Sequence, residues 1–202
     1  MIRTPNNSSA WEVRESVYRR LFGGEPDVWH EMTELDPHID IYGFKPGFAG
    51  RDFVTLVTSG MSDRQMRLPA GMPPEIQKRR VELVFYCASA KQEYAELLRR
   101  LAHYVFDNNT WLGAGHTMET HDIALLDSGH ANCLLFMPTP VIPDDSLPMR
   151  LQIDGDPVTF LWLVPITAEE CVLTRQGWFL RSLMRCLNRN GRPYVFDPTS
   201  RR

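Results

Sequence analysis

Histidine and carboxylate side chains are the residues of this 202-residue sequence whose types and spacing could do chemistry. His38 and Asp40 are two residues apart in a segment that alternates like a strand, so their side chains share one face. His116 belongs to a glycine-containing loop further along the chain. These three residues have the ligand types of a metal site if the fold brings them together. The alternative hypothesis is therefore a metal-dependent or hydrolytic enzyme that uses His38, Asp40 and His116.

The sequence lacks the motifs that would make catalysis the leading hypothesis. The segment Gly60–Arg64 begins like a G-x-S-x-G nucleophile elbow around Ser62, but Arg64 stands where the second glycine belongs. No general base is paired with Ser62 in the sequence. No H-E-x-x-H helix, phosphate-binding loop or G-x-G-x-x-G run occurs. We therefore predict no catalytic residue, no metal site and no cofactor.

Composition and charge describe an ordinary globular protein. Hydrophobic residues make up 43% and charged residues 23% of the chain, which is enough apolar material for a sizeable core. The formal net charge of -3 gives no electrostatic basis for binding nucleic acid or an anionic membrane. No stretch approaches the ~20 apolar residues of a membrane span, and no apolar signal-peptide core is present. We expect a single domain over residues 1–202, with loose termini at 1–8 and 192–202.

Cysteine usage indicates a reducing compartment. No two cysteines form a C-x-x-C pair, and each one falls within an apolar periodic segment. We predict reduced core residues in a cytoplasmic protein, without a structural zinc site. The cysteines are Cys87, Cys133, Cys171 and Cys186.

Hydrophobic periodicity predicts an α+β fold: a mixed, mostly antiparallel sheet packed with helices on one side, in a single compact domain. Apolar spacing of three and four predicts helices that begin at caps formed by Ser9, Ser89 and Thr167. The third helix is expected to break near Gln176-Gly177 and to continue over 178–190. Alternating or apolar runs predict strands over 38–44, 51–58, 80–87, 132–137, 151–153 and 158–164, with a turn at 154–157 and a stop at Pro165.

Two segments combine small, polar and aromatic residues at the ends of these elements. The turn Ser59–Asp63 follows the second strand, and its residues favour a structural role. The segment 107–117 follows the best-defined helix, and its two glycines permit a tight loop. Two interpretations of the second segment stay open: Trp111 packs into the core, or the loop forms a binding surface. His116 is expected to hold this loop through a hydrogen bond to a backbone carbonyl.

Three sequence blocks carry a family resemblance. Leu56–Asp63 reads L-V-T-S-G-M-S-D, Trp111–Thr117 reads W-L-G-A-G-H-T, and Leu163–Glu170 contains P-I-T followed by the start of a helix. All three resemble segments of the suppressor-of-fused domain, in the same order. In animals this family is known as a binding protein that restrains a zinc-finger transcription factor and has an additional C-terminal domain. Stand-alone bacterial members resemble immunity proteins, which bind and neutralise a partner toxin.

The resemblance implies a non-enzymatic protein-binding module. In its more specific form, the hypothesis is an immunity protein whose partner is a toxin. Binding would occlude the partner in a preformed groove or add a strand at a sheet edge. A homo-oligomeric structural protein is a third possibility. The candidate contacts are the proline-rich segment 138–149 and the residues Ser59, Gly60, Met61, Ser62, Asp63, Trp111, Gly113, Gly115 and His116.

Overall fold

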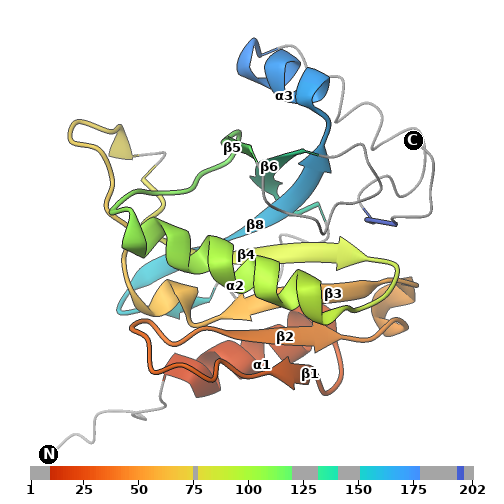
Figure 1. Cartoon of the computed structure of the whole chain (residues 1–202). Coiled ribbons are helices and arrows are strands. Elements are labelled where there is room, and N and C mark those ends of the chain that lie inside the picture. The colour runs from red at the N-terminus through yellow and green to blue at the C-terminus, as the bar shows by residue number, and fades with distance from the viewer. Residues whose placement is uncertain (1–9, 75–76, 120–131, 141–150, 178–194, 198–202) are drawn as a thin grey trace, which may run out of the picture.

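One mixed sheet organises the chain, as the computed structural model shows (Figure 1). The structure describes residues 10–74, 77–119, 132–140, 151–177 and 195–197. Its helices are α1 (Ala10–Phe22), α2 (Gln92–Asp107) and α3 (Ala168–Arg175), with short 3-10 turns η1 (Phe48–Gly50) and η2 (Met61–Asp63). Its strands are β1 (Asp27–Trp29), β2 (Asp40–Phe44), β3 (Val54–Ser59), β4 (Arg80–Cys87), β5 (Thr117–Glu119), β6 (Cys133–Pro138), β7 (Gln152–Ile153) and β8 (Asp156–Ile166).

The strand order confirms the predicted mixed, mostly antiparallel α+β fold. The order is β1-β2-β3-β4-β8-β6-β5, and β7 pairs with β8 off this path. Among the named strands of the described residues, only β4 and β8 run parallel, with Leu83 opposite Leu161. The strands expected over 38–44 and 51–58 form the antiparallel pair β2–β3, in which Tyr42 lies opposite Val57. All eight residues of β4 are buried, as expected for a central strand.

Helices cover both faces of the sheet, so the prediction of helices on one side is wrong. Leu56 and Leu83 point to the face covered by α2, whereas Val57 and Val84 point to the face covered by α1. Figure 1 shows α2 in front of the sheet and α1 behind it. The physical reason is the composition of β3 and β4, which are apolar on both faces and therefore need cover on both.

Helix starts were only partly predictable. The α2 helix has Lys91 as its N-cap and no side-chain cap, so the assignment of Ser89 as the cap is wrong. The Thr167 cap is confirmed, because its side chain accepts from the Glu170 amide while the Glu170 carboxylate accepts from the Thr167 amide. In α1, the aromatic residue Trp11 is 54% exposed, whereas Tyr18 of the same helix is completely buried. The predicted cap at Ser9 lies outside the described residues.

The β7–β8 hairpin turns through Asp154 and Gly155, both with positive φ, as a two-residue hairpin of type I′ requires. The predicted stop at Pro165 is wrong, because β8 continues to Ile166. Within the described residues, β8 pairs with β4 only as far as Trp162. Pro165 therefore lies where β6 is the remaining neighbour, a position that a proline tolerates more easily than the middle of a sheet.

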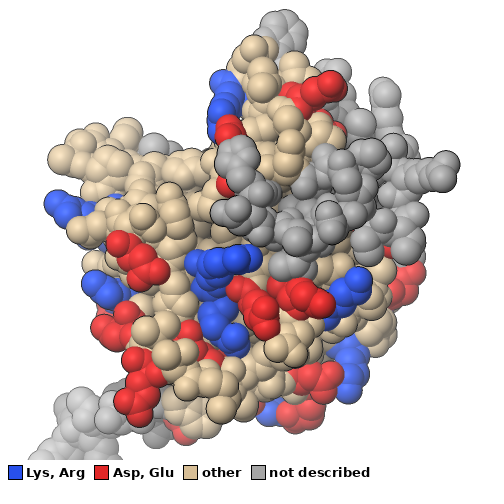
Figure 2. All heavy atoms as spheres, viewed as in Figure 1, with Lys and Arg blue, Asp and Glu red and all other residues tan. Residues whose placement is uncertain are grey.

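Several predictions fall on residues that the structure does not describe: the helix over 178–190, the loop at 141–149, Cys186 and the leader 1–8. Cys87, Cys133 and Cys171 are buried and free. In the expected loose tail, Phe196 packs in the α2 core cluster. No helix in the described part of the chain is long and apolar enough to span a membrane. Figure 2 shows acidic and basic side chains interspersed on one face of the molecule, without a large patch of either sign.

Candidate functional site

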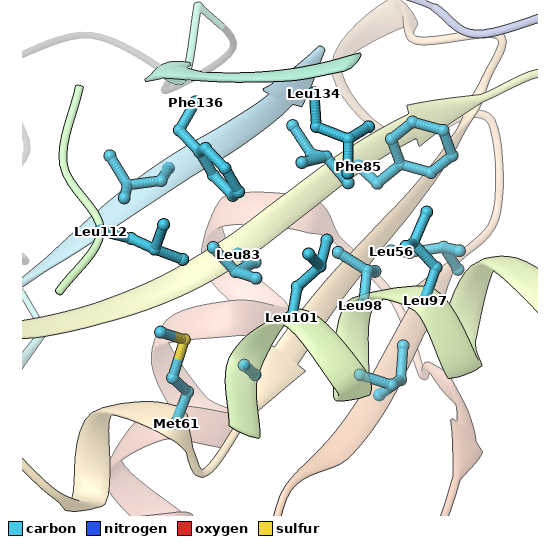
Figure 3. Close-up of a cluster of buried hydrophobic side chains, with 14 of the residues drawn as sticks. Leu56, Met61, Leu83, Phe85, Leu97, Leu98, Leu101, Leu112, Leu134 and Phe136 are labelled. Atoms are coloured by element: carbon cyan, nitrogen blue, oxygen red, sulfur yellow. The ribbon is translucent and has the colours of Figure 1, made fainter. Parts of the chain in front are cut away.

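Both motif segments lie at the same end of the sheet. Ser59 ends β3 and η2 follows directly, while the segment Trp111–His116 follows the C-terminus of α2. The backbone amide of Leu112 lies 3.4 Å from Met66 Sδ, just beyond η2. Figure 3 shows Met61 and Leu112 both directed into the core cluster beneath α2. We call the segments Ser59–Asp63 and Trp111–His116 together the motif end of the sheet.

The side chain of Glu82 in β4 stabilises the turn Ser59–Asp63 through hydrogen bonds. Its carboxylate is completely buried. Oε2 accepts a hydrogen bond of 2.5 Å from the Thr58 hydroxyl. Oε1 accepts bonds of 2.6 Å and 3.0 Å from the hydroxyl and amide of Ser62, and one of 3.2 Å from the Gly60 amide. Every one of these contacts is a donor, which is the pattern of an ionised carboxylate.

Arg14 of α1 supplies the compensating cation. Its Nε lies 3.4 Å from Glu82 Oε1, and its guanidinium also forms an ion pair with Asp63 and reaches the Ser59 hydroxyl. Burial raises the pKa of Glu82 above its usual value, although Arg14 and the Ser62 and Thr58 hydroxyls act in the opposite direction. Burial lowers the pKa of Arg14, but its acidic neighbours outweigh this and leave it raised. The buried pair therefore joins α1 to the centre of the sheet.

Sequence reasoning missed Glu82 and Arg14. The available signal was a charged residue inside a strand whose neighbours are apolar on both sides. A second signal was an arginine on the helix face that carries Tyr18 and Leu21. Charged residues are almost never fully buried unless they are paired. The two signals predict that each residue has a partner, but not that they partner each other.

The turn Ser59–Asp63 is mainly structural. Met61 and Ser62 have no exposed surface, and Ser62 donates its hydroxyl to Glu82 rather than to a base. Gly60 has φ of 126°, and a Cβ there would lie 1.9 Å from the His38 carbonyl oxygen. Only glycine fits this position. The other four residues of the turn are buried, and Asp63 has 41% of its side chain exposed.

The segment Trp111–His116 is held by ring packing and backbone bonds. The rings of Trp111 and His116 pack edge to face with centroids 4.2 Å apart. A Cβ on Gly113 would lie 2.5 Å from the Trp111 ring, so this glycine makes room for the indole. The Gly115 amide donates to the Phe136 carbonyl at 2.7 Å, and the Phe136 amide donates to the His116 carbonyl at 2.9 Å. Through these two bonds the loop pairs with the backbone of β6.

The burial of this loop differs from residue to residue. Trp111 is partly buried against the α2 cluster, and Leu112 is 3% exposed. Ala114 and Gly115 are exposed at the tip. Burial lowers the pKa of His116, and a hydrogen bond to the Trp111 backbone raises it by less. That bond agrees with the prediction that His116 holds its own loop.

His38 and Asp40, which were expected on one strand face, lie close together, but their neighbours are not those of the hypothetical site. His38 Nε2 lies 3.2 Å from one Asp40 oxygen, and His30 Nδ1 lies 3.1 Å from the other. Next to them, the buried Glu31 accepts from His103 of α2 at 2.7 Å. His116 packs on Trp111 instead. Within the described ranges, no group of three or more histidine, cysteine or acidic residues is arranged to hold a metal ion.

This histidine–carboxylate cluster connects the β1–β2 segment to α2. Glu31 also accepts from the Ile39 amide at 2.8 Å. Arg99, one turn before His103 on α2, donates to the carbonyls of Trp29 and Ile39. The segment 29–39 is thus attached to α2 at both ends, which is a structural use of these polar groups.

Comparison with known proteins agrees with this architecture. The model of the suppressor of fused protein family matches residues 36–201. The chain belongs to the suppressor of fused family. The matched residues of this suppressor of fused domain include Glu82 and both motif segments, whereas α1 with Arg14 precedes them. No curated protein matches the sequence.

Solved structures show the same fold at low sequence identity. A putative suppressor of fused homologue from Neisseria gonorrhoeae has 17% identity and a TM-score of 0.61, with 95% of each chain covered. A structure described as the Sufu–Fu complex has 16% identity and a TM-score of 0.65, covering 95% of this chain and 88% of that one. Drosophila Suppressor of Fused has 17% identity and a TM-score of 0.59, and the match covers 91% of this chain and 48% of the Drosophila chain.

Proposed function

We propose that this suppressor of fused domain is a non-enzymatic protein-binding module that contacts its partner through the motif end of the sheet. The observation that carries the proposal is the placement of two family motifs at the same end of one sheet. Family membership and the likeness to a structure described as the Sufu–Fu complex support the choice of a protein as the partner.

The exposed residues of the motif end are few and well supported. Asp63, Ala114 and Gly115 reach the surface, and Trp111 and His116 are half-buried beside them. Glu82 holds one segment and the β6 backbone holds the other. A surface that is already ordered loses little conformational entropy on binding, so even a small contact area contributes to affinity. The buried members of the motifs then act by shaping this surface.

The more specific form of the proposal is an immunity-type role, in which the partner is a toxin that the domain occludes. Two modes of contact are consistent with the fold. The partner can cover the motif end, or it can add a strand beside β1 or β5, which end the described strand order. The candidate segment 138–149 contributes only its first three residues to the described structure.

The test uses an exposed loop position and a matched position at the other end of the sheet. Ala114→Arg adds bulk and charge at the tip of the second motif segment. Ala90→Arg makes the same change at an exposed site just after β4, which begins at the motif end and runs away from it. Tagged wild-type protein is used to isolate a partner from its own cells, and mass spectrometry identifies that partner. Affinities of the three purified proteins are then compared.

We expect wild type and Ala90→Arg to bind the partner equally and Ala114→Arg to bind at least about tenfold more weakly. An unchanged affinity for Ala114→Arg contradicts the proposed site. Failure of the wild type to retain any stoichiometric protein contradicts the binding function. For the immunity-type role, producing this domain should restore growth of cells that express the partner, whereas Ala114→Arg should not.

A further inference from the structure

Two cysteines from distant segments meet at the end of the core on the α1 face. Cys133 is the first residue of β6, and Cys171 lies in the first turns of α3. Their Sγ atoms are 2.6 Å apart, and the residues are 0% and 3% exposed. A disulfide bond has a sulfur–sulfur distance of about 2.03–2.05 Å, so only a small movement separates this contact from a bond.

The surrounding structure holds both sulfur atoms in place. Cys133 lies opposite Ile166, which ends β8 immediately before the Thr167 cap of α3. From the other end of α3, Arg175 donates to the Glu119 carboxylate at 2.9 Å. The helix is therefore attached to the sheet on both sides of Cys171.

We propose that Cys133 and Cys171 are a redox modification site, at which a reversible disulfide joins α3 to β6. The site is independent of the motif end and of the proposed partner. Cys87, which is also buried, has no such sulfur neighbour among the described residues and provides an internal comparison. The chemical class of reactant is a small two-electron oxidant, for which hydrogen peroxide is the probe.

Cys133 sets the order of reaction that we assign. Its Sγ lies 2.6 Å from Cys171 Sγ and 3.9 Å from the Leu134 carbonyl oxygen, and its single S–H can bond to either. Burial, followed by the hydrogen bond with Cys171, raises the pKa of Cys133 to about 12, while the neighbouring Arg175 acts in the opposite direction. Because a thiolate is the nucleophile, the proposal gives the first attack to Cys171 and the second to Cys133.

The reaction balances as two thiols and one peroxide giving one disulfide and two waters. The Cys171 thiolate attacks a peroxide oxygen, the O–O bond breaks, and the released hydroxide takes up a proton to leave as water. Cys171 is then a sulfenic acid. Cys133 loses its proton as its sulfur attacks Cys171 Sγ, the S–S bond forms, and the sulfenic hydroxyl leaves as the second water.

The experiment treats the reduced full-length protein with hydrogen peroxide and then blocks the remaining thiols. Intact mass without reductant should show the loss of two hydrogen atoms, and peptide mapping should recover a 133–171 cross-link. Cys133→Ser and Cys171→Ser should abolish the cross-link, whereas Cys87→Ser should retain it. Because the bond closes a long loop, the oxidised protein should unfold at a Tm higher by on the order of 5–10 °C, and dithiothreitol should reverse the shift.

The wild-type result alone decides the proposal, so it does not depend on whether the serine variants fold. A cross-link between 133 and 171 that dithiothreitol removes supports it. Overoxidation of Cys171 without a cross-link overturns it. A cross-link that involves Cys186, or thiols that stay reduced at a peroxide level that oxidises a free thiol, also overturns it.

Discussion

The two segments of the motif end are held in physically different ways. The turn Ser59–Asp63 is built over a buried ionised carboxylate, with Glu82 and Arg14 between α1, β3 and β4. The segment Trp111–His116 is built from ring packing and backbone bonds to Phe136, and its tip is exposed. Both are equally distinctive as sequence, yet the first is mainly enclosed and the second is only half-enclosed.

This difference shows that a sequence motif can have its residues either for the stability of the fold or for the shape of the surface. In the first segment Gly60, the Ser62 hydroxyl and Met61 all fill or bond to the protein interior. A substitution at any of them therefore acts on the stability of the fold. In the second segment Gly113 makes room for Trp111, and the neighbouring tip residues Ala114 and Gly115 are exposed to solvent. Substitutions in the two segments should therefore differ in both size and kind of effect.

The largest effect is expected from Glu82→Ala. It leaves Arg14 buried without its buried counter-charge and leaves the Ser62 and Thr58 hydroxyls without their acceptor, which costs about 3–5 kcal/mol of unfolding free energy. Urea denaturation followed by circular dichroism measures the loss. The control is Glu34→Ala at an exposed loop acid, expected within about 0.5 kcal/mol of wild type. A loss below about 1 kcal/mol for Glu82→Ala would show that the turn does not depend on the buried carboxylate.

An intermediate effect is expected from Gly113→Ala. The added Cβ cannot stay 2.5 Å from the Trp111 ring, so the indole or the loop moves, at a cost of about 1–3 kcal/mol. The tryptophan signal in near-UV circular dichroism should change together with stability. Ala114→Ser, at the neighbouring exposed position, should change neither. A stable variant with a wild-type tryptophan signal would mean that Gly113 is not needed to seat the indole.

The smallest effect is expected from titrating His116. Burial lowers its pKa in the folded protein, so the unfolded chain binds the proton more readily, and stability falls as pH drops through the unfolded value of about 6.5. The contribution should stay below about 1 kcal/mol because the ring is only partly buried, so solvent screens the effect. Urea unfolding of wild type and His116→Gln at pH 7.5 and 5.5 measures it. The wild type should lose more stability than the variant, and equal losses would contradict the assignment.

Local signals in the sequence predicted much of the fold. The bounds of β4 and the Thr167 cap follow from residues that are close together in the chain. The exposure of Trp11 and the continuation of β8 through Pro165 depend on which neighbours the fold supplies. Periodicity identifies an apolar face but does not say on which side of the sheet the helix will lie.

The candidate site was predictable in position but not in mechanism. The motif residues were identified, and their common location was left open. The Glu82–Arg14 pair joins segments far apart in the chain, and no spacing rule connects them. The same holds for Glu31 and His103, which pair with each other next to His38 and Asp40. The hypothesis from the sequence had placed His116 beside His38 and Asp40 instead.

The parallel pair β4–β8, the single one among the described strands, bears on how the chain reaches its native state. β4 is complete at residue 87, but its parallel neighbour begins only at Asp156. During synthesis, one edge of β4 therefore has no strand partner until most of the chain has been made. Contacts of such long sequence separation slow folding and leave an apolar edge open to wrong pairings. We expect the first hundred residues to be aggregation-prone on their own, and the arrival of β8 to be the step that closes the sheet.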